Sequence, residues 1–454
     1  MKTYQDLLEA GLNSENVTAE QLMEFTKEVV FDYRGSEMYD VIKTAENYDK
    51  GRNTTILNYR KLLYTLTGQA IDDTISANYK IASRFYNRFT TQQVQFLLGN
   101  GVTWENESTA ERLGGDFDVQ LQKVAKYALN GVGYGFFNKD HVEVFKGTEF
   151  APLFDEENGA LMAGVRFWQV STTKPLRATL YTLNGYVDYM WEDGVGTVLR
   201  DFTPYILYTR TSIADGTEIY YGENYPTFPV VPMFPNPNKQ SELIGLREQI
   251  DAYDLIKSGF CNTIDEASII YWTINNAGGM DDVDLATFVE RIKTVHAAIV
   301  EDTGATAESH TLEAPYQGRE TLLDRLESDM YKDYMALNVD EIKGGANTAT
   351  QIRAAYEPMN NKADQFEYCV IDFINGILEV AGIDDKPTFT RSYLINTQEE
   401  IATVLQAATY LDDEYVTRKI LTLLGDADKA EEVLQAMEDY DYKRTMGEES
   451  LEEE

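Results

Sequence analysis

Cysteine and histidine are scarce in this chain. Its 454 residues include only two cysteines, Cys261 and Cys369, each within an amphipathic run typical of a helix. Two isolated thiols cannot build a disulfide framework, so we expect both to be buried, unpaired side chains. The three histidines, His141, His296 and His310, stand at no metal-ligand spacing, and we therefore expect no metal site.

Basic residues are also few. Lys and Arg total 39 against 76 Asp and Glu, which gives a formal net charge of -37 at pH 7. A protein that grips nucleic acid with a basic patch needs cations in excess, so any contact with DNA must be a loose one. Carboxylate pairs for acid/base chemistry cannot be picked out of so many acidic residues without a fold, and we infer no catalytic residue.

Long apolar runs and phosphate-binding loops are missing as well. The chain opens with MKTYQD, and no later stretch approaches the about 20 uncharged residues that span a bilayer. We therefore expect an intracellular, soluble protein without membrane contact. There is no P-loop, and the glycines of residues 131–135 lack the last spacing of a dinucleotide-binding turn. We expect neither a cofactor nor an enzyme.

The chain does have ample apolar material, with 43% hydrophobic residues. That is enough for a substantial core and more than one folding unit. Residues 1–126 show helical periodicity between polar connections, which predicts a mostly helical region. Two runs illustrate it: Leu22, Phe25, Val29 and Val30, and then Ile75, Tyr79 and Ala82.

From residue 127 to 231 the pattern changes to short runs of Val, Tyr, Phe and Thr. These runs are broken by Asn158-Gly159, Asn184-Gly185 and Asp193-Gly194, which suit tight hairpin turns. The sequence therefore predicts an antiparallel β region. Its clearest hairpin pairs residues 178–183 with residues 186–191 across Asn184-Gly185.

A proline cluster in residues 228–237 is predicted to end the β region, because proline cannot continue a central strand. Apolar residues then recur at helical spacing from Ser241 to about Asn275, among them Leu246, Ile250 and Tyr253. A helix of that length would measure about 50 Å. Its acidic residues exclude a membrane span, so we interpret it as a coiled coil or a strut in an assembly.

A second amphipathic run, Gln317 to Asn338, carries Leu326, Met330 and Tyr334 on its apolar face and is predicted to pair with the first. Between the two runs lies an insert, residues 277–315, with a short helix predicted at 283–295 and a strand at 298–301. We interpret this insert as a small α/β module at the end of a two-helix stalk.

Residues 339–347 are predicted to form a flexible polar loop, since they include Gly344-Gly345. Thr348 then has the spacing of a capping residue for a helix that ends at Gly382. Pro358 lies within that helix, and we predict a kink just before it. Residues 397–440 predict two or three short amphipathic helices, and residues 441–454 an acidic, mobile tail.

Together with this order of elements, a set of residues and motifs is typical of one known family. They are Tyr48, Gly51 and Ile56; PMFPN at 232–236; Ser241-Glu242-Leu243; Ile250-Asp251-Ala252-Tyr253-Asp254; Ser258; Asn262; and Thr348 to Ala355 with the preceding glycines. In these features the chain resembles the portal proteins of tailed double-stranded DNA bacteriophages, of the siphophage type. The resemblance covers roughly residues 40–440 and is diffuse in the β region. The segment FLLGN at residues 96–100 departs from the family pattern, since it lacks the proline that often follows the glycine.

The resemblance implies an α+β portal fold, in which a mainly helical wing contains the antiparallel β region. The implied parts are a wing at 1–235, a two-helix stem at 236–276 and 316–338, a small α/β clip at 277–315, a tunnel (channel) loop at 339–347, a kinked helix that returns to the wing at 348–396, a helical crown at 397–440 and the mobile tail at 441–454.

The function that the resemblance implies is that of a ring, most commonly a dodecamer, at one vertex of the capsid in the virion. The ring assembles in the host cytoplasm, and double-stranded DNA passes through it. Its clip would face the large terminase during packaging and head-completion (adaptor) proteins afterwards. The major capsid and scaffolding proteins are further implied partners.

Two sets of site residues follow from the resemblance. The DNA channel would be lined by the tunnel loop, with Asp340, Glu341, Lys343, Gly344, Gly345 and Asn347, and the stem would contain Leu246, Ile250, Tyr253, Leu326, Met330 and Tyr334. Lys343 is the basic side chain of the predicted loop, so it is either a DNA contact or simply a solvated lysine. Acidic walls, screened over about 8 Å at physiological salt, would repel the moving polyanion and keep friction low.

Two other classes of function stay open on the sequence alone. One is another phage ring or baseplate component that never surrounds DNA. The other is an acidic enzyme with an unrecognised site, which would form a monomer or a small oligomer. A ring with a central hole wide enough for duplex DNA would distinguish the portal from both.

Overall fold

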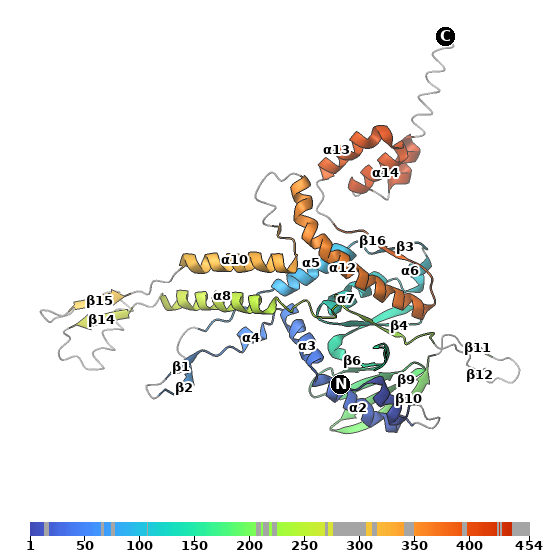
Figure 1. Cartoon of the computed structure of the whole chain (residues 1–454), viewed down its shortest axis with the longest axis horizontal. Coiled ribbons are helices and arrows are strands. Elements are labelled where there is room, and N and C mark those ends of the chain that lie inside the picture. The colour runs from blue at the N-terminus through green and yellow to red at the C-terminus, as the bar shows by residue number, and fades with distance from the viewer. Residues whose placement is uncertain are drawn as a thin grey trace, which may run out of the picture.

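The computed structural model resolves a broad body with a long two-helix arm on one side (Figure 1). Among the described helices, none combines the length and the apolar character needed to cross a bilayer. The structure describes the chain except for residues 13–17, 65–67, 74–77, 107, 206–209, 212–217, 220–224, 268–270, 276–305, 311–315, 340–348, 393–396, 425, 427–428 and 438–454.

The amino-terminal region is mainly helical, as its periodicity predicts. Its longest helices bury one apolar face each, and α2 begins with a reciprocal capping box between Thr18 and Gln21. The helices are α1 (Tyr4–Leu7), the π-helix η1 (Leu8–Leu12), α2 (Ala19–Arg34), α3 (Glu37–Asp49), α4 (Thr54–Leu57), α5 (Phe85–Leu98), α6 (Ser108–Arg112) and α7 (Phe117–Leu129). A short hairpin, β1 (Leu62–Tyr64) with β2 (Ala70–Asp72), lies between α4 and α5.

The predicted β region contains a five-stranded antiparallel sheet in the order β10-β9-β8-β7-β6. Helix α2 covers one face of this sheet, and together they bury the second apolar cluster of the chain. The strands are β6 (Phe150–Phe154), β7 (Leu161–Trp168), β8 (Leu176–Tyr181), β9 (Gly185–Glu192) and β10 (Val195–Pro204). Two short strands, β11 (Arg210–Thr211) and β12 (Glu218–Ile219), form a separate hairpin.

Two of the predicted hairpin turns can be compared with the observed register. Asp193 and Gly194 both adopt positive φ, of 47° and 84°, as a tight primed turn requires. At Asn184-Gly185 the prediction of a hairpin is correct but its register is not, because Tyr181 pairs with Tyr186 and Leu176 with Trp191. The loop is longer than two residues, since the backbone of Thr182 bonds that of Gly185 before the strands pair.

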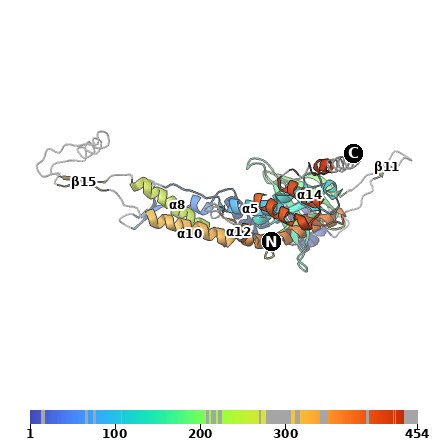
Figure 2. The ribbon, with the colours of Figure 1, turned by 90° about the horizontal axis from the view of Figure 1, so that it is seen from above.

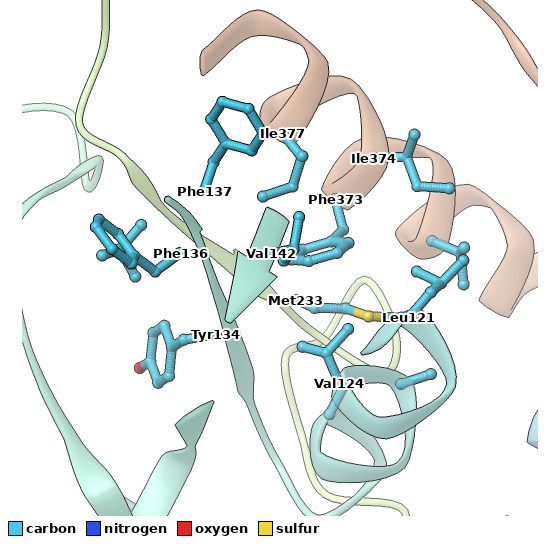
Figure 3. Close-up of a cluster of buried hydrophobic side chains, with 14 of the residues drawn as sticks. Leu121, Val124, Tyr134, Phe136, Phe137, Val142, Met233, Phe373, Ile374 and Ile377 are labelled. Carbon is cyan, nitrogen blue, oxygen red and sulfur yellow. The ribbon is translucent and has the colours of Figure 1, made fainter. Parts of the chain in front are cut away.

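A three-stranded sheet, β13-β4-β5, lies at the centre of the largest apolar cluster (Figure 3). Its strands are β4 (Gly133–Asn138), β5 (His141–Lys146) and β13 (Val230–Met233). The proline cluster therefore forms a strand of its own before the β region ends. Pro232 is tolerated because β13 is an edge strand, where one backbone donor can be missing.

Two helices cover one face of this sheet. A Cβ at Gly133 would collide with the backbone of α7, and a Cβ at Gly135 would lie 2.5 Å from the ring of Phe373. The absence of these side chains lets α7 and α12 (Ala349–Ala381) approach the strand closely. On the opposite face Tyr134 packs against Phe150, which joins this sheet to the five-stranded one.

The two-helix arm consists of α8 (Arg247–Ala267) and α10 (Tyr316–Tyr334), which run side by side away from the body in both views (Figures 1 and 2). Beyond them β14 (Tyr271–Asn275) pairs with β15 (Thr306–His310). The helices predicted for residues 241–275 and 317–338 are thus each too long. Gly245, with φ of 88°, precedes the first helix, and Met335, with φ of 61°, follows the second.

The prediction was also wrong for residues 271–275, which form a strand. Aromatic and β-branched residues dominate the sequence YWTIN, and they favour extended backbone when a partner strand is present. Of the predicted insert, residues 306–310 are described, as the partner strand β15. The helix expected at 283–295 and the strand expected at 298–301 lie outside the described residues.

Helix α12 includes Pro358 and continues past it to Ala381, and its ribbon changes direction in its first part (Figure 1). The kink predicted just before Pro358 stays a prediction. It ends as predicted at Gly382, which has φ of 63°. The capping residue expected for this helix, Thr348, lies outside the described residues. After α12 the chain returns to the body, where β16 (Pro387–Phe389) pairs with β3 (Val102–Trp104).

The carboxyl-terminal region is helical, as predicted. It contains α13 (Thr397–Ala407), the 3-10 turn η3 (Ala408–Tyr410) and α14 (Asp413–Leu424), and residues 430–437 are also helical. The tail expected at 441–454 lies outside the described residues. Both cysteines lie in helices and are free, but they are half-buried rather than buried.

Candidate functional site at the base of the two-helix arm

The six residues predicted for the stem come together where the arm meets the body. Five of them are buried in one apolar cluster with residues of α3 and α5, and the sixth, Leu326, packs against it. We call this cluster the arm base. Its buried members are Ala45, Tyr48, Phe85, Tyr86, Phe89, Leu243, Leu246, Ile250, Tyr253, Met330, Tyr331 and Tyr334.

Aromatic contacts between α5 and the two arm helices dominate the arm base. The ring of Phe89 stacks on Tyr334 at 5.0 Å and meets Tyr331 edge-on at the same distance. Phe85 meets Tyr253 of α8 edge-on at 4.9 Å. Aromatic pairs in these geometries add to the stabilisation from burial alone, so α5 is the element that holds both arm helices.

Tyr334 also has polar contacts at the same place. Its hydroxyl donates a hydrogen bond of 2.6 Å to Oε1 of buried Gln93. The ammonium of Lys362, on α12, lies 4.0 Å from the centre of its ring and 2.6 Å from the carboxylate of Glu242. Burial, with nearby carboxylates, raises the pKa of Tyr334 well above its usual value, so the hydroxyl stays protonated as a donor.

The face of α8 next to this apolar cluster carries a polar network. The Tyr48 hydroxyl lies 2.5 Å from the Asp251 carboxylate and 3.0 Å from Asn53. Burial, reinforced by the hydrogen bond to Asp251, raises the pKa of Tyr48 to about 12. The Asn53 amide donates to the fully buried carboxylate of Asp254 at 2.9 Å. These contacts fix α8 to the segment between α3 and α4.

An extended segment, residues 79–83, lies along α8 through three regularly spaced hydrogen bonds, which we call the ladder. The backbone N–H of Ser83 donates to Asp254 at 2.9 Å, that of Ile81 to Ser258 at 3.0 Å and that of Tyr79 to Asn262 at 2.7 Å. The acceptors are four residues apart on the helix and the donors two residues apart on the segment. One helical turn and two extended residues have similar lengths, so the bonds stay in register.

The ladder corrects the prediction of a helix at Tyr79 and Ala82. These residues are not helical, because the backbone donors that a helix would use are bonded to side chains of α8 instead. The polar spacing of Asp254, Ser258 and Asn262 on an otherwise apolar helix was the available signal. It identifies the helix face but not the segment that binds there.

Removal of one ladder acceptor should loosen the segment locally. In Ser258→Ala the N–H of Ile81 loses its acceptor, and a part-buried donor without a partner costs about 1–3 kcal/mol. Hydrogen exchange should therefore accelerate at Ile81 by about tenfold or more. Leu255→Ala, which changes an exposed side chain of the same helix, is the matched control and should leave exchange at Ile81 unchanged. Equal exchange in both variants would contradict the ladder.

The charge of Asp254 predicts an unusual dependence of stability on pH. Burial raises the pKa of this carboxyl above its ordinary value of 3.8, although hydrogen bonds from Asn53 and Ser83 and the charge of Lys257 oppose the rise. Between 3.8 and the raised pKa the folded chain binds more protons than the unfolded chain, so this group's contribution to stability falls as the pH rises through that interval.

Denaturation of the wild type and of Asp254→Asn between about pH 3 and pH 7 isolates this contribution, because the other carboxyls cancel. The wild type should lose stability relative to the variant as the pH rises. The exposed Asp385, whose pKa is lowered mainly by the hydrogen bond from Thr109, should show the opposite sign in Asp385→Asn. A pH-independent difference for Asp254→Asn would refute the assignment.

Several of the residues that carry the family resemblance thus meet at the arm base and its polar network. Hydrogen bonds link Tyr48 to Asp251, 203 residues later in the chain, and through Asn53 to Asp254. Ser258 and Asn262, on the same helix, take part in the ladder. Sequence reasoning missed Asn53 and the residues of α5, Gln93 among them, which complete these contacts.

The second set of predicted site residues cannot be placed. Asp340, Glu341, Lys343, Gly344, Gly345 and Asn347 lie outside the described residues. Within the part of the chain that the structure describes, no three His, Cys, Asp or Glu side chains gather closely enough to hold a metal ion. The arrangement that the described residues do form is a structural joint between the arm and the body.

Comparison with known proteins adds a family match. A family model described as "Phage portal protein, SPP1 Gp6-like" matches residues 31–441. The portal protein of Bacillus phage SPP1 is 22% identical over 391 residues, which cover 77% of this chain and 74% of that protein. The portal protein of Clostridium phage phiCD119 is 24% identical over 185 residues, covering 39% of this chain and 41% of that protein.

Solved structures of gene transfer agent (GTA) particles are also similar. The neck of a native particle, computed with C12 symmetry, matches with a TM-score of 0.44 and 11% identity, and covers 82% of this chain and 98% of that chain. The neck of an empty particle, computed with C6 symmetry, matches with a TM-score of 0.45 and 10% identity, and covers 75% and 90%.

Proposed function

The chain belongs to the phage portal protein family of the SPP1 Gp6-like kind, and from this premise we propose that copies of it form a ring-shaped channel through which double-stranded DNA enters and leaves a phage capsid. The ring, a dodecamer, occupies one vertex of the capsid in the virion and assembles in the host cytoplasm. Its role is structural and not enzymatic.

The observation that carries the proposal is the two-helix arm. A pair of helices that extends away from the body of the protein is only weakly stabilised, because about half of each helix surface is exposed to water. Arms of this kind are stabilised when many copies stand side by side around an axis. We assign α8 and α10 to the stem of the ring (Figure 1), and residues 277–315 to the clip.

Imaging of the purified chain by electron microscopy tests this proposal. We expect rings with a central hole wide enough for duplex DNA and with one rotational symmetry. Rings without such a hole would favour another phage ring or baseplate component. Sedimentation that finds only monomers or small oligomers at micromolar concentration would overturn the proposal and favour an acidic enzyme.

The remaining parts follow the same scheme. The region before the arm, with both sheets, forms the wing, and α13 and α14 form the crown. The clip faces the large terminase during packaging and head-completion proteins afterwards, and the wing faces the major capsid and scaffolding proteins. The net charge of -37 supports a passage that repels DNA instead of binding it.

The loop between α10 and α12 is assigned to the narrowest part of the channel, with Lys343 as its DNA contact. Deletion of Gly344 and Gly345 should leave rings intact but lower the yield of packaged DNA, since the shortened loop adjusts less well to a moving duplex. The measurement is packaged DNA per ring-containing particle, with ring formation followed by microscopy. Unchanged packaging would remove the loop from the mechanism.

A further inference from the structure

A basic stripe runs along the exposed side of α5, in a chain that has about half as many basic as acidic residues. Arg84 and Arg88 lie one turn apart and line an open groove of about 430 Å³. The other side chains of the groove are neutral and polar: Asn87, Thr91, Gln92 and Gln95.

The charge of this stripe is only weakly neutralised within the chain. Among the described residues no carboxylate lies within ion-pair distance of Arg84, whose guanidinium reaches Asn87 at 3.4 Å. Arg88 donates to the Tyr331 hydroxyl at 2.8 Å and lies 3.9 Å from Glu327, with 58% of its side chain exposed. Nearby Lys126, by contrast, is paired with Asp49 at 2.9 Å, so it adds little free charge to the stripe.

An acidic groove of about 510 Å³ lies between α3 and the start of α8. Glu37, Asp40 and Glu248 line it and outnumber Arg247, which lies 3.9 Å from Asp251. Its apolar lining includes Ile244, whose side chain is 56% exposed. Within the part of the chain that the structure describes, no cation lies within ion-pair distance of Glu37, Asp40 or Glu248, so these acids can accept the cations of another molecule.

The two grooves share no lining residue, since the basic one is built on α5 and the acidic one on α3 and the start of α8. Glu248 is about 200° around α8 from Ile250, which packs with the residues of α10. Arg88, by contrast, contacts Tyr331 and Glu327 on α10 itself. A surface of one sign on one side and of the opposite sign on the other suits head-to-tail contacts, in which the rotation between copies closes a ring.

We propose that neighbouring copies of this chain join head to tail at the arm base, with Arg84 and Arg88 of one copy in the acidic groove of the next. This inference rests on the proposed ring. Copies that each carry a charge of -37 repel one another, so their contact needs a local region of opposite charges. The scarce cations of α5 supply it.

Charge reversal on each side tests the proposal. Arg84→Glu with Arg88→Glu makes both surfaces acidic, and Glu37→Lys with Asp40→Lys and Glu248→Lys makes both basic. Each variant alone should lose rings, with the ring fraction falling at least about tenfold at micromolar concentration. An equal mixture should recover rings, because acidic and basic copies can alternate, and these rings should contain even numbers of subunits.

Controls separate this inference from folding and from the proposed function. Lys174→Glu with Arg177→Glu reverses two exposed cations near the five-stranded sheet and should keep rings. Circular dichroism spectra should match that of the wild type for all variants, which separates loss of rings from loss of folding. Wild type without rings would overturn the proposed function itself. If the variant with Arg84→Glu and Arg88→Glu forms rings as the wild type does, the inference is overturned, even if that variant binds DNA more weakly. An equal loss of rings in the control variant would overturn it too.

Discussion

Tyr334→Ala should lower the free energy of unfolding by about 3–5 kcal/mol, the range for removal of a large buried aromatic side chain. The side chain is 3% exposed and connects its own helix, α10, to α5 and α12. Its loss removes the stacking on Phe89, the contact with Lys362 and the donor to Gln93. Because α5, α10 and α12 meet here, the effect should concentrate where the arm joins the body.

Chemical denaturation, with hydrogen exchange of α8 and α10, measures this effect. Tyr334→Phe keeps the ring and loses the hydrogen bond, so its cost should be about 1–3 kcal/mol, from the acceptor left on Gln93. Tyr316→Ala, at the other end of α10 and 46% exposed, serves as the control and should have a smaller effect. A cost for Tyr334→Ala no larger than that of Tyr316→Ala would disprove the anchoring role.

Phe373→Ala should be similarly severe, with a loss of about 3–5 kcal/mol. Its ring is 1% exposed and packs on the central sheet (Figure 3), at the point where Gly135 has no side chain. Strand β4 is paired on both sides and cannot move to fill the space that the ring leaves. A cavity would therefore remain beneath α12. The melting temperature and the denaturation midpoint of the whole chain report this loss.

A double-mutant cycle with Gly135 sharpens the test. A Cβ at Gly135 would lie 2.5 Å from the Phe373 ring, so Gly135→Ala alone should cost about 1–3 kcal/mol through overpacking. In Phe373→Ala the space is already open, and the added methyl should then cost less. Strict additivity of the two substitutions would show that α12 does not press on the strand at this point.

The buried face of a helix could be predicted from the sequence where apolar and polar residues alternate at helical spacing. The spacing of Ile250, Tyr253, Met330 and Tyr334 identified the buried faces of both arm helices before any partner was known. The end of α12 at Gly382 and the turn at Asp193-Gly194 could also be predicted, because each depends on a positive φ at a residue type that tolerates it and on no distant contact.

What failed depends on contacts far along the chain. Residues 79–83 have helical spacing but bond to a helix about 180 residues later, and no local signal specifies that partner. Residues 271–275 become a strand only because residues 306–310 are there to pair with them. Propensity gives way to tertiary pairing in both cases.

The ladder between residues 79–83 and α8 has a mechanical consequence. A force along the axis of α8, the direction in which the arm extends, would strain the bonds at Asp254, Ser258 and Asn262 together, in shear. A force across the helix would peel them apart one after another. The joint therefore resists axial sliding far better than sideways bending, so the arm can tilt while its register on the body is kept.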